Sequence, residues 1–80
     1  MDEDGIYLRL RDNLATVLTD VAPGELTLDR TLAELGCNSV DRAEVVTMTM
    51  EDLGITVPVM EFQDVKDVRS LVELFGKYAP

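Results

Sequence analysis

Three stretches of this chain carry apolar residues at every third or fourth position, and this spacing constrains the fold more than any other feature. The stretches are residues 3–21, 39–53 and 67–78. Such spacing predicts amphipathic helices, because the residues that share one face of a helix recur with that period. Ala22-Pro23-Gly24 follows the first stretch and Gly54 follows the second, and both sequences interrupt a helix.

The segments between these helices also carry local signals. In residues 25–31, Leu26 and Leu28 alternate with polar residues, which would fit a short strand, but we expect an ordered loop that packs on the helices. Thr31 and Glu34 have the spacing of a capping box, followed by at most one helical turn. Residues 55–58 predict an extended linker and residues 61–65 a short helix. We therefore expect an all-α fold, a small four-helix bundle of three long helices and one short helix, in a single domain over residues 1–80.

The second helix is expected to turn one face to the core and the other to solvent. Winding it at about 100° per residue places on the core side Ala43, Val45, Val46, Thr49, Met50 and Leu53. The outward side then carries Val40, Asp41, Glu44, Thr47, Met48 and Glu51. Apolar side chains among carboxylates are typical of a docking surface, although scattered exposed apolar residues are also common.

Composition disfavours several classes of function. Sixteen acidic and seven basic residues give a formal net charge of −9, which repels nucleic acid and anionic membrane surfaces. The same charge favours encounter with basic proteins, or it serves only to keep the chain soluble. The sequence has no His, the usual general base and the commonest metal ligand. We therefore expect neither an enzyme nor a metal site.

The single cysteine and the N-terminal sequence bear on location. Cys37 alone cannot form an internal disulfide, which fits a reducing compartment, and we interpret it as a packing residue. The acidic N-terminus is followed by no secretory apolar run, and no segment is long and apolar enough for a membrane span. We therefore expect a cytoplasmic protein.

Two roles compete for Ser39 at the start of the second predicted helix. Serine is a favoured N-cap, so a purely structural role is one interpretation. Asn38 caps equally well, and with Asn38 as the cap, Asp41 lies at the third helical position, where its charge suits the helix dipole. The Ser39 hydroxyl is then free, and a phosphodiester on it faces the positive end of the helix. Without a histidine base, Ser39 is not expected to be catalytic.

The residues around Ser39 resemble the signature of acyl carrier proteins, whose usual form is Gly-x-Asp-Ser-Leu. Here the signature reads Gly36-x-Asn38-Ser39-Val40, followed by Asp41-x-x-Glu44-Val45-Val46. The resemblance covers nearly the whole chain, including Leu32-x-x-Leu35-Gly36 and residues 54–58. It implies that a phosphopantetheinyl transferase attaches a 4′-phosphopantetheine arm to Ser39, whose thiol holds acyl groups as thioesters. The chain is then a covalent substrate of other enzymes.

Two departures from that signature imply that partner recognition differs from the usual one: Asn38 replaces the usual Asp, and Arg42 adds a cation to an acidic helix. Residues 38–44, together with residues 47–51, resemble a narrower group, the free-standing carriers of polyketide β-branching cassettes. This similarity implies a malonyl or acetyl cargo, an acyltransferase, a ketosynthase-like decarboxylase and an HMG-CoA-synthase-like enzyme as partners, and a monomeric carrier. The outward face of the second helix and the two departures give the predicted docking residues: Asn38, Val40, Asp41, Arg42, Glu44, Met48 and Glu51. An aminoacyl or peptidyl carrier and a non-covalent acidic adaptor remain open alternatives.

Overall fold

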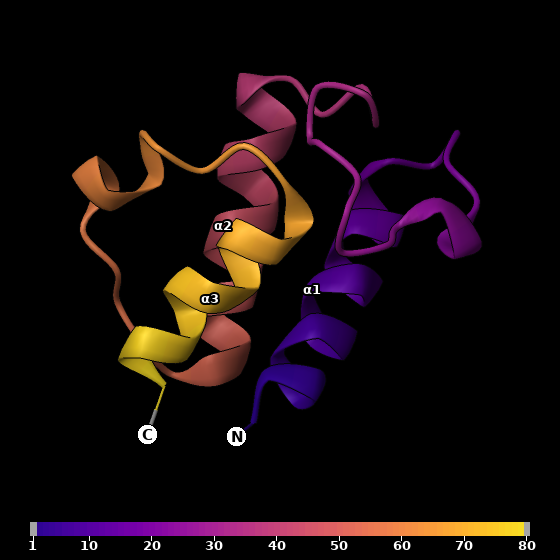
Figure 1. Ribbon diagram of the computed structural model, residues 1–80. Helices are drawn as coiled ribbons and strands as arrows, with labels where there is room; N and C mark the ends of the chain where they lie inside the picture. Colours follow the sequence, from indigo (N-terminus) through magenta and orange to yellow (C-terminus); the bar gives the residue numbers. More distant parts are fainter. Residues whose placement is uncertain (1, 80) are drawn as a thin grey trace.

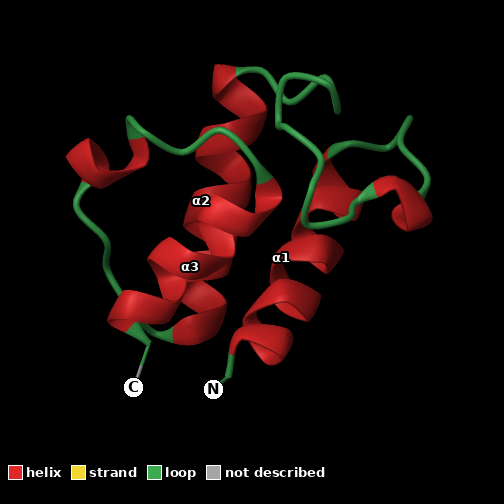
Figure 2. Ribbon diagram, in the orientation of Figure 1, coloured by secondary structure: helices red, strands yellow, loops and turns green. Residues whose placement is uncertain are grey.

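Three α-helices joined by long loops make up the structure, a computed structural model that describes residues 2–79 (Figures 1 and 2). The elements in chain order are α1 (Glu3–Val17), the 3₁₀ helix η1 (Pro23–Glu25), α2 (Ser39–Leu53), the 3₁₀ helix η2 (Val59–Phe62) and α3 (Val68–Tyr78). Within residues 2–79 the only strand-like pairing is an isolated bridge between Thr31 and Asp67. The all-α prediction is confirmed, with the short helix present as η2, which begins at Val59 rather than at residue 61.

The first helix is shorter than its apolar pattern predicted. It ends at Val17, and Leu18 leaves helical geometry while its N–H still bonds to the Leu14 carbonyl. Thr19 and Asp20 follow, and both residue types favour a helix interior only weakly. The turn nevertheless keeps Leu18 in the core and Val21 packed against it, so the periodic apolar pattern continues beyond the helix.

The second helix has the predicted bounds, because each end carries its own local signal. Asn38 caps the N-terminus, and Gly54 ends the helix in a left-handed conformation with φ of 67°. On the core side, Val45, Val46 and Thr49 are buried, whereas Met50 and Leu53 are only half-buried. Ala43, predicted to face the core, is exposed instead, because its side of α2 borders an open groove.

The core lies where α1 packs against both α2 and α3. Its fully buried members include Ile6, Leu10, Leu14, Val45, Leu71 and Phe75. A buried polar contact joins α1 to α2: Nδ2 of Asn13 donates to Oγ1 of Thr49 at 2.9 Å and to Oδ2 of Asp52 at 3.1 Å. Oγ1 of Thr49 in turn donates to the Val45 carbonyl at 2.8 Å. These bonds satisfy the polar groups that the interface buries.

The long loop between α1 and α2 is held in place by the segment before α3. The backbone N–H of Leu32 donates to the Lys66 carbonyl at 2.9 Å, and that of Val68 donates to the Arg30 carbonyl at 3.1 Å. The predicted capping box is also present, since Thr31 and Glu34 exchange hydrogen bonds of 3.1 and 3.2 Å between backbone N–H groups and side chains. The loop is therefore ordered up to the start of α2.

Candidate functional site

Ser39 occupies the first helical position of α2, and its neighbour Asn38 caps the helix. The side-chain oxygen of Asn38 accepts a hydrogen bond from the backbone N–H of Asp41 at 2.9 Å. The Asp41 carboxylate in turn accepts one from the backbone N–H of Asn38 at 3.3 Å. This reciprocal pair fulfils the capping role that Ser39 was also a candidate for, and it fixes the start of the helix.

The Ser39 side chain is exposed and is not used by the fold. Within residues 2–79, no hydrogen bond involves its hydroxyl, because Asn38 has taken the capping position. The hydroxyl therefore stands at the positive end of a fifteen-residue helix, where an anionic group attached to it is electrostatically favoured.

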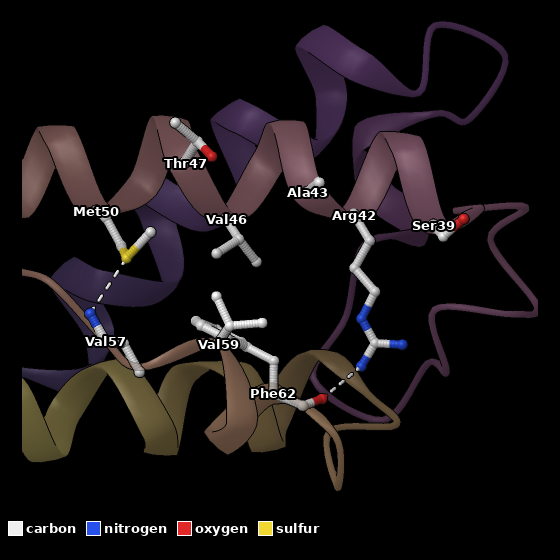
Figure 3. A pocket seen from close by; sticks show the side chains of 9 residues that line it. All are labelled: Ser39, Arg42, Ala43, Val46, Thr47, Met50, Val57, Val59 and Phe62. Carbon is white, nitrogen blue, oxygen red and sulfur yellow. Dashed lines mark hydrogen bonds between the residues drawn. The ribbon is translucent and has the colours of Figure 1, made fainter.

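An apolar groove of about 260 Å³ starts beside Ser39 and lies between α2 and the segment that contains η2 (Figure 3). One wall comes from α2: Ser39, Arg42, Ala43, Val46, Thr47 and Met50. The other wall comes from Val57, Val59 and Phe62. The backbone N–H of Val57 donates to the Met50 sulfur at 3.3 Å, which joins the two walls away from Ser39. Val59 and Phe62 were not among the predicted site residues, and only their apolar character inside a connecting segment hinted at them.

Arg42 joins the two walls of the groove close to Ser39 (Figure 3). Its Nη2 atom donates to the Phe62 carbonyl at 3.2 Å and also to the Val65 carbonyl. The residue is half-buried. The Arg42 side chain, expected as a cation among the acids of α2, is therefore bound to the backbone at the end of η2 and just after it.

The other predicted docking residues lie along α2 and just before it. Val40 is 73% exposed, and Asn38, Glu44 and Glu51 are exposed as well. Met48 and Asp41 were predicted to face outward, but they are half-buried and not fully exposed. Because residues three and four positions apart share a helix face, Val40, Glu44, Met48 and Glu51 form one continuous strip, named here the α2 strip.

Similarity to known proteins identifies the family to which this chain belongs. A family model of the phosphopantetheine attachment site matches residues 9–75. The chain belongs to this family of carrier domains. The carrier domain is 38% identical over 74 residues to the polyketide biosynthesis acyl-carrier protein AcpK of Bacillus subtilis. The aligned residues cover 92% of this chain and 90% of that protein.

Two further relatives support the same assignment. The acyl carrier protein of Treponema pallidum is 34% identical over 74 residues, which cover 88% of this chain and 94% of that protein. Among solved structures, the crystal structure of the curacin biosynthetic pathway HMG synthase in complex with acetyl donor-ACP contains a chain that matches with a TM-score of 0.86 and 27% identity. The match covers 96% of the carrier domain and 99% of that chain. The predicted fold, a small helical bundle of acyl-carrier type, is confirmed.

The family assignment makes 4′-phosphopantetheine the cofactor of the carrier domain. The residues present fit this group, because an exposed serine hydroxyl without a structural role stands at a helix N-terminus and opens onto an apolar groove. When bound, the group supplies a thiol on which acyl units are held.

Cys37 lies two residues before Ser39 but differs from it chemically. Burial raises the pKa of the Cys37 thiol, and the negative charge of Asp41 raises it further, against a smaller opposing effect of Arg42. The thiol is therefore protonated at neutral pH, and a protonated thiol is a poor nucleophile. Its half-buried position against the core agrees with the packing role predicted from the sequence.

In the part of the chain that the structure describes, no three His, Cys, Asp or Glu residues are grouped so that they could bind a metal ion. None of the helices found between residues 2 and 79 has the length and apolar character that crossing a membrane requires.

Proposed function

We propose that this carrier domain holds an acetyl unit on a phosphopantetheine arm at Ser39 and donates it to an HMG-CoA-synthase-like enzyme. The likeness to a chain of the HMG synthase and acetyl donor-ACP complex carries this proposal. Because the match covers 99% of that chain, the matched chain is the carrier of the complex. Asn38 and Arg42, which depart from the usual carrier signature, are consistent with a specialised partner.

The residues of the chain would bind, orient and present the cargo without catalysing its transfer. The Asn38–Asp41 pair holds the first turn of α2 in place, and the N-terminus of α2 stabilises the negative charge of a phosphodiester on Ser39. Because the chain has no histidine, a phosphopantetheinyl transferase would have to supply the base that activates Ser39. An acyltransferase and a ketosynthase-like decarboxylase would then provide the acetyl unit from a malonyl group. We propose that these reactions take place in the cytoplasm and that the carrier domain is a monomer.

We further propose that partners dock on the α2 strip and on Asn38 and Asp41 beside it. Glu44→Lys should slow acetyl transfer at low salt and weaken its salt dependence, because exposed interface charges act mainly on the rate of encounter. The free energy of unfolding should change by no more than about 0.5 kcal/mol, since Glu44 is exposed. Asp12→Lys makes the same change in charge at an exposed position of α1 and serves as the control. Transfer at the wild-type rate by Glu44→Lys in low salt would exclude this strip as the docking surface.

The acetyl-donor assignment is tested by competition for one enzyme. The HMG-CoA-synthase-like enzyme is offered equal amounts of the acetylated carrier domain and an acetylated fatty-acid carrier, and the acetyl lost from each is followed by mass spectrometry. The carrier domain should react at least about a hundredfold faster, because a difference of roughly 3 kcal/mol in transition-state binding is within reach of one specific interface. Equal rates would refute the acetyl-donor proposal and leave the general carrier function.

A further inference from the structure

The 3₁₀ helix η2 lies between Val57 and Val65, which are both buried in the core, but it buries no residue of its own. η2 is four residues long and has no buried residue, and Val59 and Met60 are 84% and 75% exposed. A single 3₁₀ turn of this length is not stable alone, so its position depends on contacts to the rest of the bundle. One contact is between the rings of Phe62 and Phe75, whose centroids lie 6.0 Å apart.

Arg42 supplies the polar contact on the side of Ser39. The carbonyls of Phe62 and Val65 lie at and just after the end of η2. The Phe62 carbonyl also accepts a hydrogen bond from the backbone N–H of Val65 at 3.2 Å, so Arg42 adds a second donor to it. One guanidinium nitrogen binds both carbonyls and so ties α2 to residues twenty and twenty-three positions later. Hydrogen bonds from a charged donor are about twice as strong as neutral ones.

The consequence of this contact lies at the opening of the groove. Arg42 is three positions after Ser39 and lies on the same side of α2, and both line the groove opposite Val59 and Phe62 (Figure 3). Arg42 therefore helps to set the separation between Val59 and the first turns of α2, whereas the Val57–Met50 hydrogen bond joins the walls at the other end of the groove. Val59, the most exposed large apolar residue of the described chain, stands on the wall that Arg42 holds.

We propose that Arg42 is a positioning residue: it fixes η2 against α2, so that an acyl-accepting enzyme contacts Val59 and the α2 strip as one rigid surface beside Ser39. The expected effect of Arg42 on acetyl transfer rests on the carrier function proposed above. The expected effect of Arg42 on the position of η2 does not depend on that function. It differs from a direct contact between the Arg42 charge and the partner, because the guanidinium is already bound to two carbonyls.

Two substitutions separate positioning from direct charge recognition. Arg42→Met keeps an unbranched apolar stem but removes the charge and the donors, whereas Arg42→Lys keeps a charge and donors that reach the same carbonyls less well. Amide hydrogen exchange is measured for both variants and wild type, together with circular dichroism to establish that each is folded. In Arg42→Met, exchange at residues 59–66 should rise about tenfold, as expected for loss of a charged hydrogen bond, while the α1 amides stay protected. Arg42→Lys should show a smaller increase.

Acetyl transfer then tests whether the fixed segment matters to the partner. For Arg42→Met as the acetyl donor, the KM of the partner enzyme should rise about fivefold with little change in kcat. The ratio of this KM to the wild-type KM should be the same at low and high salt. Unchanged exchange at residues 59–66 would overturn the positioning role, whether or not the chain proves to be an acetyl donor. Faster exchange with unchanged KM would overturn the link to docking. A KM effect that disappears at high salt would show direct charge recognition instead.

Discussion

Ser39→Ala should leave a folded, helical protein that gains no mass when it is incubated with coenzyme A and a broad-range phosphopantetheinyl transferase. Wild type should gain the mass of one arm. The fold should survive because the Ser39 side chain is exposed, Asn38 provides the cap, and alanine favours a helix. Intact-protein mass spectrometry and circular dichroism give the two readouts.

The second serine of the chain provides the matched control. Ser70 occupies the third position of α3, but its hydroxyl donates to the Asp67 side chain at 2.6 Å and accepts from the backbone N–H of Asp67 at 3.2 Å. Ser70→Ala should therefore be loaded as wild type is, although α3 loses part of its cap. An arm on Ser39→Ala, or failure of loading only in Ser70→Ala, would contradict the assignment of Ser39.

Phe75→Ala should destabilise the carrier domain by about 3–5 kcal/mol, enough to unfold much of a population of so small a domain. Phe75 of α3 is fully buried in the hydrophobic core, and its ring also packs against the ring of Phe62 of η2. The substitution therefore removes core volume and the contact that supports Phe62 in the wall of the groove. Urea unfolding measures the free-energy change. Leu8→Ala removes a side chain of α1 that is 48% exposed, and it should cost far less. A cost below about 1 kcal/mol for Phe75→Ala would show that this core is not packed as described.

Local signals in the sequence were sufficient for α2 and for the position of Ser39. Asn38, Asp41 and Gly54 each act within a few residues of the helix ends, so the bounds of α2 follow from them without knowledge of the rest of the fold. The end of α1 was placed too late, because Leu18 and Val21 still contact the core from a turn and so continue the apolar pattern. The spacing of apolar residues indicates which side chains are buried, and Leu18 and Val21 contact the core although they lie beyond the end of α1.

The groove and the role of Arg42 could not be predicted in the same way. Arg42 bonds to backbone carbonyls twenty and twenty-three residues away, and these carbonyls carry no signature in the side-chain sequence. From the sequence, Arg42 was visible only as a charge, which suggested contact with partners. Ala43 was assigned to the core for a related reason: its angle around the helix is correct, but the neighbour on that side, η2, stands away from α2 and leaves the groove.

The central claim, covalent carriage of an acyl group on Ser39, is tested most directly on wild-type protein purified from its native host. Intact-protein mass spectrometry should show a mass increase equal to one phosphopantetheine arm, with part of the population carrying an additional acetyl or malonyl group. Fragmentation should place the arm on the peptide that contains Ser39, and mild hydroxylamine should remove the acyl group but not the arm. A protein that is active in its pathway but carries no arm, or carries it on another residue, would contradict the account.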